Sequence, residues 1–313
     1  MITGLFADKP VYRKFFILVF VISLSTILFS MLGGLLADHF YGVNVLSDPK
    51  ALSNLEDPLV MSAMKLLQIL TTGFGMFLIP AILAAILFST KPRSYLSATK
   101  MANPLLLGLT LLLTFSAVPF INSLLIFNQQ LHLPEFLSGV ESWMRASEDN
   151  AARITEMFLK MDTSLELLFN LFIVALLPAL GEELLFRGVL QRLFKELTNN
   201  IHVAIILTSI LFSAIHMQFF GFIPRMLLGM LFGYLLHWTG SIWVPIFAHL
   251  VNNGAAVIFA YYAGNNQLPF NQDTIGTENG EWPYVIISLA LIFGLGFLIK
   301  KLSTGNITEE TSS

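Results

Sequence analysis

The chain contains eight runs of apolar residues, each close to the length of about 20 residues with which a helix crosses the hydrocarbon core of a bilayer. Hydrophobic residues make up 55% of the 313 residues, and mean hydropathy is +0.74. Charged residues make up 12%, about half the roughly 25% of a soluble domain. We therefore predict an all-α, polytopic membrane helical bundle with about eight transmembrane helices, at residues 12–36, 64–89, 102–127, 166–194, 201–218, 222–239, 241–263 and 283–301.

The first apolar run follows Lys9, Arg13 and Lys14, an arrangement that signal peptides share. Its core, residues 15–37, is longer than the 7–15 apolar residues typical of a signal peptide, and no clear small-residue cleavage site follows. We interpret this run as a retained first span. The fifth and sixth runs are short, so we expect them to be tilted, broken or buried against their neighbours.

Basic residues are distributed unequally between the two sides that these spans define. If the N-terminus is cytoplasmic, ten basic residues fall on the inner side and six on the outer side, and this bias favours cytoplasmic N- and C-termini. We accordingly expect an integral protein of the plasma membrane of a bacterium. The inner residues are Lys9, Arg13, Lys14, Lys91, Arg93, Lys100, Arg192, Lys195, Lys300 and Lys301, and the outer ones are Lys50, Lys65, Arg145, Arg153, Lys160 and Arg225.

Composition excludes several classes of function. The chain has no cysteine, so disulfides, thiolate nucleophiles and cysteine metal ligands are absent. Its net charge of −3 and the lack of a basic cluster argue against nucleic acid as a partner. The partner expected from composition is the lipid bilayer.

The chain divides into three regions. Residues 1–165 form an N-terminal three-span accessory region, 166–263 a core, and 264–313 an outer loop, the last span and a short cytoplasmic tail. Within the first region, residues 128–165 mix charges with apolar residues at helical spacing. This segment predicts one or two amphipathic helices on the outer surface, either as a packed cap over the bundle or as a partner-binding element.

Ionisable groups at membrane depth are the strongest sign of function. Each costs at least about 2.5–3.5 kcal/mol on insertion scales and usually faces the interior of a bundle. Such groups come from the fourth, fifth and seventh predicted spans at overlapping depths, so we expect one site that opens toward the cytoplasmic half. They are Glu182, Glu183, Arg187, His216 and His249, with Asn252 and Asn253 just after.

Helical spacing gives these residues different surroundings. Glu183 and Arg187 are four residues apart and can pair on one helix face, either as a self-neutralising ion pair or as part of a site. Glu182 points about 100° away and has no partner in its own segment, which suits a general base or acid. His249 and Asn253 are also four residues apart, whereas His216 is compatible with both a packing and a catalytic role. His202 and His237 lie at the ends of predicted spans, and we assign them no catalytic role.

Three motifs in this order resemble those of the CPBP family of intramembrane endopeptidases, also called Abi. This is the CAAX-processing and bacteriocin-processing group, which includes the Ras-converting CAAX protease of eukaryotes. "EELLFR", "FSAIH" and "HLVNN" match its EExxxR, FxxxH and HxxxN patterns. The resemblance covers about residues 165–263 and leaves out the first three spans.

The resemblance implies hydrolysis of peptide bonds in a membrane-associated or lipidated protein or peptide. Glu182 and His216 would activate water, His249 and Asn253 would stabilise the oxyanion, and Glu183 and Arg187 would hold this geometry. Family members are described as metalloproteases, and Glu182, His216 and His249 could bind Zn²⁺ or another divalent metal with water in the fourth position. The zincin signature HExxH is absent, so a metal rests on the resemblance alone.

Two other classes of function remain as alternatives. A proton-coupled transporter would use intramembrane Glu and His as a relay, but it should show two half-repeats, and none is evident. A catalytically silent immunity or scaffold protein would retain the fold without the chemistry. The predicted spans contain no aspartate pair like that of presenilin and no GxSG-like serine motif like that of rhomboids.

Overall fold

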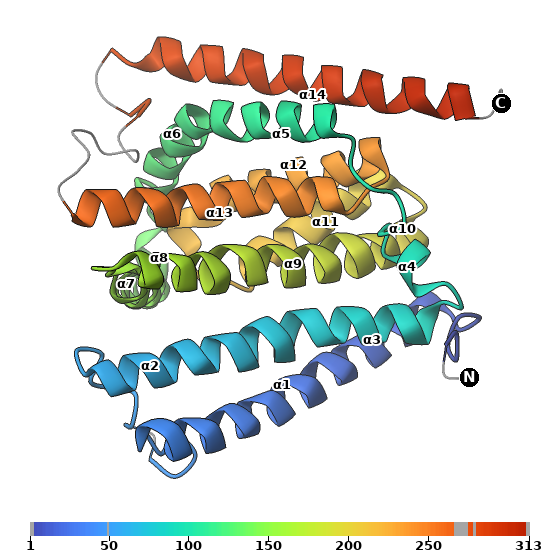
Figure 1. Ribbon diagram of the computed structural model, residues 1–313. Coiled ribbons are helices and arrows are strands. Elements are labelled where there is room, and N and C mark those ends of the chain that lie inside the picture. Colours follow the sequence, from blue (N-terminus) through green and yellow to red (C-terminus); the bar gives the residue numbers. More distant parts are fainter. Residues whose placement is uncertain (1–2, 49, 266–274, 278–279, 311–313) are drawn as a thin grey trace.

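A computed structural model describes residues 3–310 apart from 49, 266–274 and 278–279. Most of the outer loop predicted before the last span therefore lies outside the described residues. The described part contains helices and no strand, which confirms the prediction of an all-α, polytopic membrane bundle. Successive long helices run in opposite directions, and both ends of the chain lie at the same end of the bundle (Figure 1).

Within the described residues, seven helical segments are long and apolar enough to cross a membrane: Val11–Tyr41, Pro58–Phe88, Pro104–Gln129, Ser164–Thr198, Phe219–Thr239, Trp243–Gly264 and Trp282–Thr304. Several of them contain successive helical elements. Their parts are α1 (Val11–Tyr41), α2 (Pro58–Leu67), η1 (Gln68–Leu78), α3 (Ile79–Phe88), α5 (Pro104–Ser116), α6 (Val118–Gln129), α8 (Ser164–Asn170), η3 (Leu171–Leu176), α9 (Leu177–Glu183), η4 (Leu184–Leu190), α10 (Gln191–Thr198), η5 (Phe219–Gly221), α12 (Phe222–Thr239), α13 (Trp243–Gly264) and α14 (Trp282–Glu310).

The fifth predicted span, residues 201–218, is shorter in the structure. It forms α11 (Ile201–Ala214), whose 14 residues rise about 21 Å, less than the roughly 30 Å of a hydrocarbon core. Asn200 caps its start by accepting hydrogen bonds from two backbone N–H groups. The chain then turns at Met217, which has a φ of 54°, so His216 lies in a turn and not inside a helix.

Local sequence signals account for the starts of the other spans. Asp57 and Asn103 each accept a backbone N–H in front of a proline, which occupies the first helical position without losing a hydrogen bond. Thr163 and Glu166 form a reciprocal capping box at the start of α8. Gly240 ends α12 with a φ of 66°, a conformation that glycine adopts without strain. These starts and ends fix which residues reach mid-bundle.

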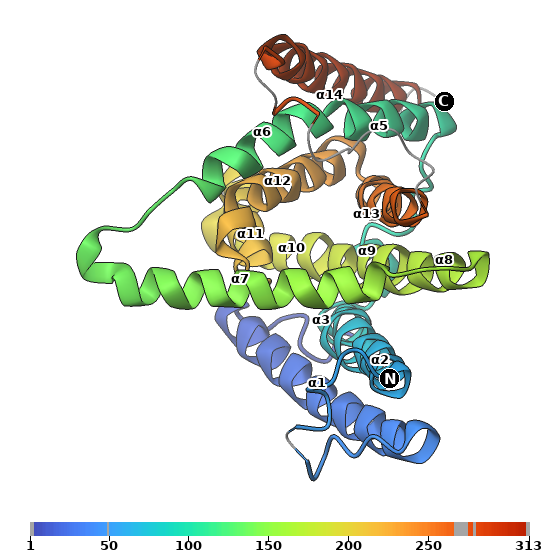
Figure 2. The same cartoon turned by 90° about the vertical axis from the view of Figure 1, so that its left-hand side faces the viewer.

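One helix lies outside the antiparallel set. It is α7 (Ser138–Leu159), which follows η2 (Glu135–Leu137) and crosses the end of the bundle opposite the chain termini (Figure 2). The amphipathic helix predicted within residues 128–165 is thus a single element of 22 residues. A short helix, α4 (Pro92–Tyr95), lies at the other end.

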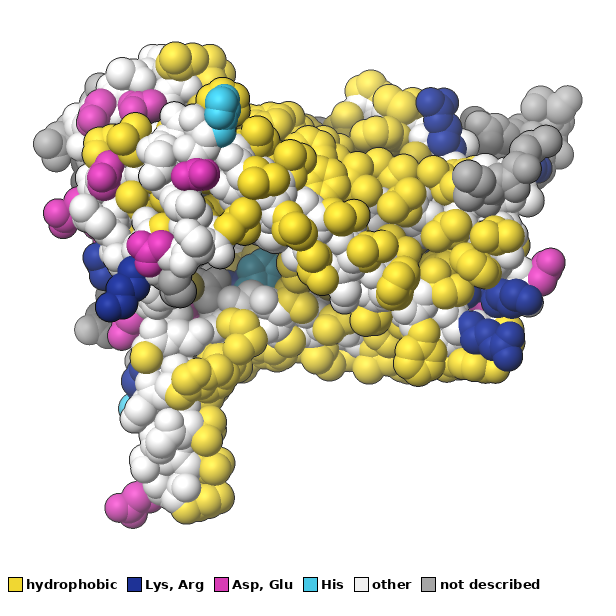
Figure 3. Space-filling model, turned by 90° about the horizontal axis from the view of Figure 1, so that it is seen from below, with side chains coloured by type: hydrophobic (Ala, Val, Ile, Leu, Met, Phe, Trp, Pro, Cys, Tyr) yellow, Lys and Arg dark blue, Asp and Glu magenta, His cyan; other side chains and the backbone are white. Residues whose placement is uncertain are grey.

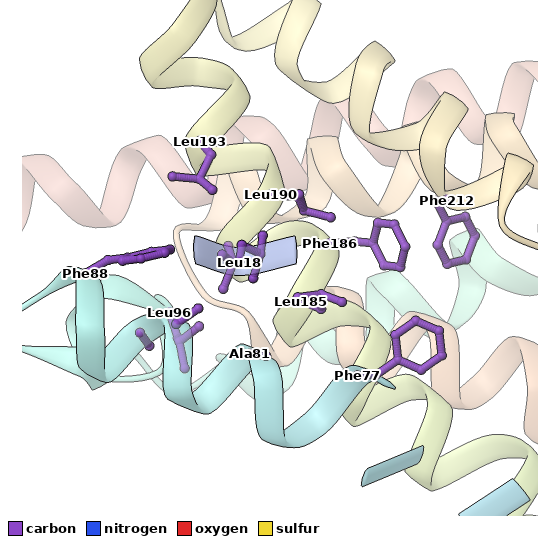
Figure 4. Close-up of a cluster of buried hydrophobic side chains, with 13 residues drawn as sticks. Leu18, Phe77, Ala81, Phe88, Leu96, Leu185, Phe186, Leu190, Leu193 and Phe212 are labelled. Atoms are coloured by element: carbon purple, nitrogen blue, oxygen red, sulfur yellow. The ribbon is translucent and has the colours of Figure 1, made fainter. Parts of the chain in front are cut away.

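The first two spans pack against the fourth through a large apolar cluster. Phe186 lies between Phe77 and Phe212, with ring centroids 6.2 and 5.2 Å away (Figure 4). A side chain at Gly181 would place its Cβ 2.9 Å from the Cβ of Phe77, so glycine is needed for η1 and α9 to approach this closely. This contact fixes the backbone next to Glu182.

On the face shown in Figure 3, hydrophobic side chains cover the middle and charged side chains gather toward the two ends. The helices α1 and α14 lie at opposite edges of the bundle (Figure 1). Only 11% of the apolar window of α1 and 17% of that of α14 is buried, so both helices present most of their surface to lipid.

Candidate active site

The ionisable residues at membrane depth come together from three parts of the chain. Glu182 and Glu183 end α9, between the π-helical elements η3 and η4, and Arg187 follows in η4. His216 lies in the turn after α11, and His249 lies in the first half of α13. Single π-helical turns inside a helix often occur at functional sites, because the wider turn changes the direction of the side chains that follow.

A buried hydrogen-bonded chain supports the site. The Glu183 and Arg187 side chains are both 0% exposed and form an ion pair in which Arg187 Nη1 donates to Glu183 Oε1 over 2.9 Å. The same oxygen lies 2.8 Å from Nδ1 of His249. Arg187 Nη2 donates to the carbonyl of Gly229 in α12, so the chain joins the fourth, sixth and seventh spans.

Aromatic rings enclose this charged chain. The Arg187 guanidinium lies 4.4 Å from the ring centroid of Phe212, in cation–π geometry. The His249 ring stacks on Phe232, with centroids 5.4 Å apart and an interplanar angle of 22°. These contacts exclude water from the ion pair and hold the imidazole plane in one orientation.

The second nitrogen of His249 faces the other candidate residues. Its Nε2 lies 3.2 Å from Nδ2 of Asn253 and 4.0 Å from Oε2 of Glu182. Because a carboxylate oxygen accepts at Nδ1, that nitrogen carries a proton, and Nε2 of the neutral ring is an acceptor for the Asn253 amide. Asn253 Nδ2 also donates to the carbonyl of Val174, which fixes the amide.

Glu182, His216 and His249 line a common cavity of about 240 Å³ together with Asn252 and Asn253. His216 Nδ1 lies 2.7 Å from the carbonyl of Phe212, which can only accept, so Nδ1 is the donor and Nε2 remains an acceptor. Glu182 is 8% exposed, whereas Glu183 is fully buried. The two adjacent glutamates therefore differ: one borders the cavity and the other is a structural partner of Arg187 and His249.

The wall of the cavity includes residues that the sequence did not assign to the site. Ile121 and Leu125 of α6 line it, so the third span borders the site although it lies in the predicted accessory region. Arg225, interpreted from sequence as an outer basic residue, also lines it. The available signal was its position, nine residues after His216 in the first turn of an apolar span.

The position of the cavity differs from the sequence prediction. We expected an opening toward the half that holds both termini. Instead, the cavity is bordered by Gly221 and Pro224, next to the α11–α12 turn, which faces the opposite end of the bundle. The reason is that α11 ends early, which places its following turn and His216 within the depth of the longer helices.

The helix α7 and the end of α6 hold this turn in place. Asn128 donates to the carbonyl of Phe219 over 3.0 Å and accepts from the N–H of Ile223 over 3.0 Å. Ser147 of α7 donates to the carbonyl of Met217, and Glu148 accepts from the N–H of Phe220. These four hydrogen bonds fix the backbone on the C-terminal side of His216.

The remaining polar residues are occupied elsewhere. His202 is exposed at the end with the termini, where its ring pairs with the Tyr234 hydroxyl at 2.9 Å, and His237 is exposed beside it. The Ser213 hydroxyl of α11 donates to the carbonyl of Phe222 at the start of α12, which ties the two helices together.

The side chains that the resemblance assigned to a metal do not form a ligand set in this geometry. Among the residues that the structure describes, no group of three or more His, Cys, Asp or Glu side chains is placed to hold a metal ion. The His249 Nε2, which faces the cavity, lies 3.2 Å from the Asn253 amide nitrogen and 4.0 Å from Glu182 Oε2. Glu182, His216 and His249 are therefore not arranged as a three-ligand zinc site in this geometry, and no step below is routed through a metal.

Fold and site together define a polytopic membrane protein with a carboxylate–imidazole cavity inside its helical bundle. Residues 164–255 match the model of the family described as type II CAAX prenyl endopeptidase Rce1-like, so this segment of the chain is similar to the CAAX protease family. The segment contains Glu182, His216 and His249. It excludes α5 and α6, the third span that borders the cavity.

One curated relative is the uncharacterized protein YpbD of Bacillus subtilis (strain 168), which is 33% identical over 86 residues. The alignment covers 26% of this chain and 41% of the relative, so the chain spans about two fifths of the length of the relative it matches. No solved structure matches the chain.

Proposed function

We propose that the chain is an endopeptidase that hydrolyses peptide bonds of a membrane-associated or lipidated protein or peptide inside the bundle. The observation that carries this proposal is the common cavity of Glu182, His216, His249 and Asn253, supported by the buried Glu183–Arg187 pair. A carboxylate base, an imidazole acceptor and amide donors are the groups that amide hydrolysis by water requires.

In the proposed mechanism, Glu182 removes a proton from water as the water oxygen attacks the scissile carbonyl carbon. His216 Nε2, the free acceptor of its ring, holds the same water. The oxyanion is bound by the form of His249 that is protonated on both nitrogens: its Nε2 then donates to the oxyanion, and Asn253 Nδ2, no longer hydrogen-bonded to Nε2, donates to the oxyanion as well. Glu182 then gives its proton to the leaving amine as the carbon–nitrogen bond breaks.

We further propose a plasma-membrane location in a bacterium, with both termini in the cytoplasm. The excess of basic residues on the side of the termini supports this orientation. The relative from Bacillus subtilis supports a bacterial setting. In this orientation, α7 and the α11–α12 turn face the extracytoplasmic side.

The proposal is tested by proteolysis with the purified full-length chain in detergent, using a panel of membrane and lipidated peptides. Glu182→Ala, His216→Ala and His249→Ala should each lose about 100-fold or more in rate, whereas the exposed-histidine control His202→Ala should retain the wild-type rate. Cleavage that survives Glu182→Ala, or no cleavage of any peptide, contradicts the proposal.

The same assay with a chelator addresses the metal. Because the three candidate ligands do not assemble in this geometry, we expect the rate to be unchanged by the chelator. A loss of activity that Zn²⁺ restores would instead require that Glu182, His216 and His249 rearrange into a ligand set.

A further inference from the structure

Arg225 brings a positive charge to the catalytic cavity without a carboxylate partner. Its Nη2 donates to the side-chain oxygen of Gln218 over 2.7 Å, and its Nη1 donates to the Gln218 carbonyl over 3.4 Å. Both acceptors are neutral. Among the described residues, no Asp or Glu oxygen lies within the 4.0 Å of an ion pair with Arg225.

Two acidic side chains, Glu148 and Glu182, attract Arg225 electrostatically without a direct ion pair. Glu148 of α7 accepts from the backbone N–H of Phe220. A half-buried guanidinium whose direct hydrogen-bond partners are neutral is stabilised by an anion that contacts it. Among the described residues, no carboxylate makes that direct contact with Arg225.

The backbone next to Arg225 is shaped to admit the guanidinium. A Cβ on Gly221 would lie 3.3 Å from Nη2 of Arg225, closer than an ordinary van der Waals contact. Glycine at this position therefore leaves room for the guanidinium beside the turn. Of the five N–H donors of a guanidinium, Gln218 receives two, so further donors remain for a ligand.

The position of the Arg225 guanidinium in the cavity indicates that its ligand is part of the substrate. Arg225 lines the same cavity as Glu182 and His216, so a group bound to it would be within a few residues of the bond under attack. A planar guanidinium binds carboxylates in preference to neutral groups and often with two parallel hydrogen bonds. We propose that Arg225 binds a carboxylate of the substrate and so selects peptides with a negative charge close to the scissile bond.

This inference rests on the proposed function, and the carboxylate has two chemical sources. It could be the C-terminal carboxylate of the peptide or the side chain of Asp or Glu. The binding test therefore uses one fluorescently labelled, Leu- and Ala-rich decapeptide in three forms. The first form is neutral with a C-terminal amide, the second has a free C-terminal carboxylate, and the third has an amide end and one internal Glu.

Binding is measured by fluorescence anisotropy to the full-length Glu182→Gln variant in detergent, so that cleavage does not consume the peptide. At least one charged form should bind about tenfold or more tightly than the neutral form, and that form identifies the source of the carboxylate. Adding Arg225→Gln should remove this preference, and Arg225→Lys, which keeps the charge, should retain part of it.

Two controls separate a specific role from a structural one. Arg153→Gln, which removes an exposed arginine of α7, should leave the preference intact. Gln218→Ala, which keeps the charge of Arg225 but removes one acceptor, should also leave it intact. Equal weakening of all three peptides by Arg225→Gln, or a preference that survives it, overturns the proposal. So does the absence of any preference in the Glu182→Gln parent.

The binding test is independent of the proteolysis assay. A carboxylate preference that depends on Arg225, together with activity that survives Glu182→Ala, would overturn the proposed mechanism and leave the binding site. Glu182-dependent cleavage without a carboxylate preference would overturn only the inference about Arg225.

Discussion

Nδ1 of His249 lies 2.8 Å from Oε1 of Glu183, although the two residues are 66 positions apart in the chain. The same oxygen accepts from Arg187, so one carboxylate fixes both the arginine and the imidazole. The orientation of the ring that faces the cavity therefore depends on an ion pair that does not itself line the cavity.

Glu183→Gln should break the buried ion pair with Arg187 and so destabilise the fold. It leaves the Arg187 charge buried without a counter-ion, and removal of one partner of a buried pair costs about 3–5 kcal/mol of unfolding free energy. Arg187→Met should cost a similar amount, and the double variant less than the sum of the two, because it buries no unpaired charge. Unfolding in SDS, followed by tryptophan fluorescence, gives the three values. Additive effects would show that the pair is not coupled.

Some of the site can be predicted from spacing within one helix. The four-residue separations of Glu183 from Arg187 and of His249 from Asn253 place each pair on one face, because a helix repeats every 3.6 residues. The contact between Glu183 and His249 cannot be predicted this way, since it depends on how α9 and α13 pack. Sequence therefore identified the residues but did not show which glutamate pairs with the imidazole.

The positions of Arg225 and His216 could not be predicted from hydropathy. A basic residue at the start of an apolar run is interpreted as the end of a span, and for this reason the sequence assigns Arg225 to the outer side of the membrane. The structure ends α11 at Ala214, so the next turn carries His216 and approaches the cavity that Arg225 lines. The length of α11, which decides both positions, is not fixed by its apolar composition.

The hydrogen bonds from α6 and α7 to the α11–α12 turn should position His216. Ser147→Ala removes one hydrogen bond to Met217, worth about 1 kcal/mol, and should lower kcat roughly fivefold without changing the chemistry. Asn128→Ala removes two hydrogen bonds to the turn and should have the larger effect. Amide exchange of residues 215–221 should accelerate in both variants.

The matched control for Ser147 is Ser142→Ala on the same helix. Its hydroxyl donates to the carbonyl of Ser138, one turn earlier in α7, and not to the turn that follows His216. It should leave kcat and the exchange of residues 215–221 unchanged. An equal effect of the two serine variants would mean that α7 acts only through its overall stability.

Glu141 should make the start of α7 sensitive to acid. Hydrogen bonds from Arg145, from His132 and from the N–H of Leu133 lower the pKa of Glu141 from 4.5 to about 2. Because the pKa is lower in the folded chain, this carboxylate stabilises the fold above pH 4.5, and the effect is lost as pH falls toward 2. The Tm difference between wild type and Glu141→Gln should be largest above about pH 5 and shrink at lower pH.

The control for this pH dependence is Glu135→Gln, which removes an exposed carboxylate of the preceding turn. Its Tm difference from wild type should be small and should not follow the same pH profile. A Tm difference for Glu141→Gln that stays constant from pH 6 to pH 3 would contradict the role given to the Arg145 and His132 hydrogen bonds.

The side of the membrane from which the cavity is reached follows from the proposed orientation. Because the chain has no cysteine, a single introduced cysteine is a unique label. Thr155→Cys on α7 and Gln218→Cys in the α11–α12 turn lie toward the end opposite the termini, and Thr304→Cys lies near the C-terminal end of α14. In intact cells, a membrane-impermeant maleimide should label Thr155→Cys readily and Gln218→Cys more slowly, since Gln218 is half-buried. Thr304→Cys should react only after the cells are permeabilised.

The reverse pattern would place the termini outside and the cavity on the cytoplasmic side. Labelling of Gln218→Cys together with Thr304→Cys but not Thr155→Cys would contradict the position of the cavity itself, because α7 and the turn after His216 are joined by hydrogen bonds at one end of the bundle.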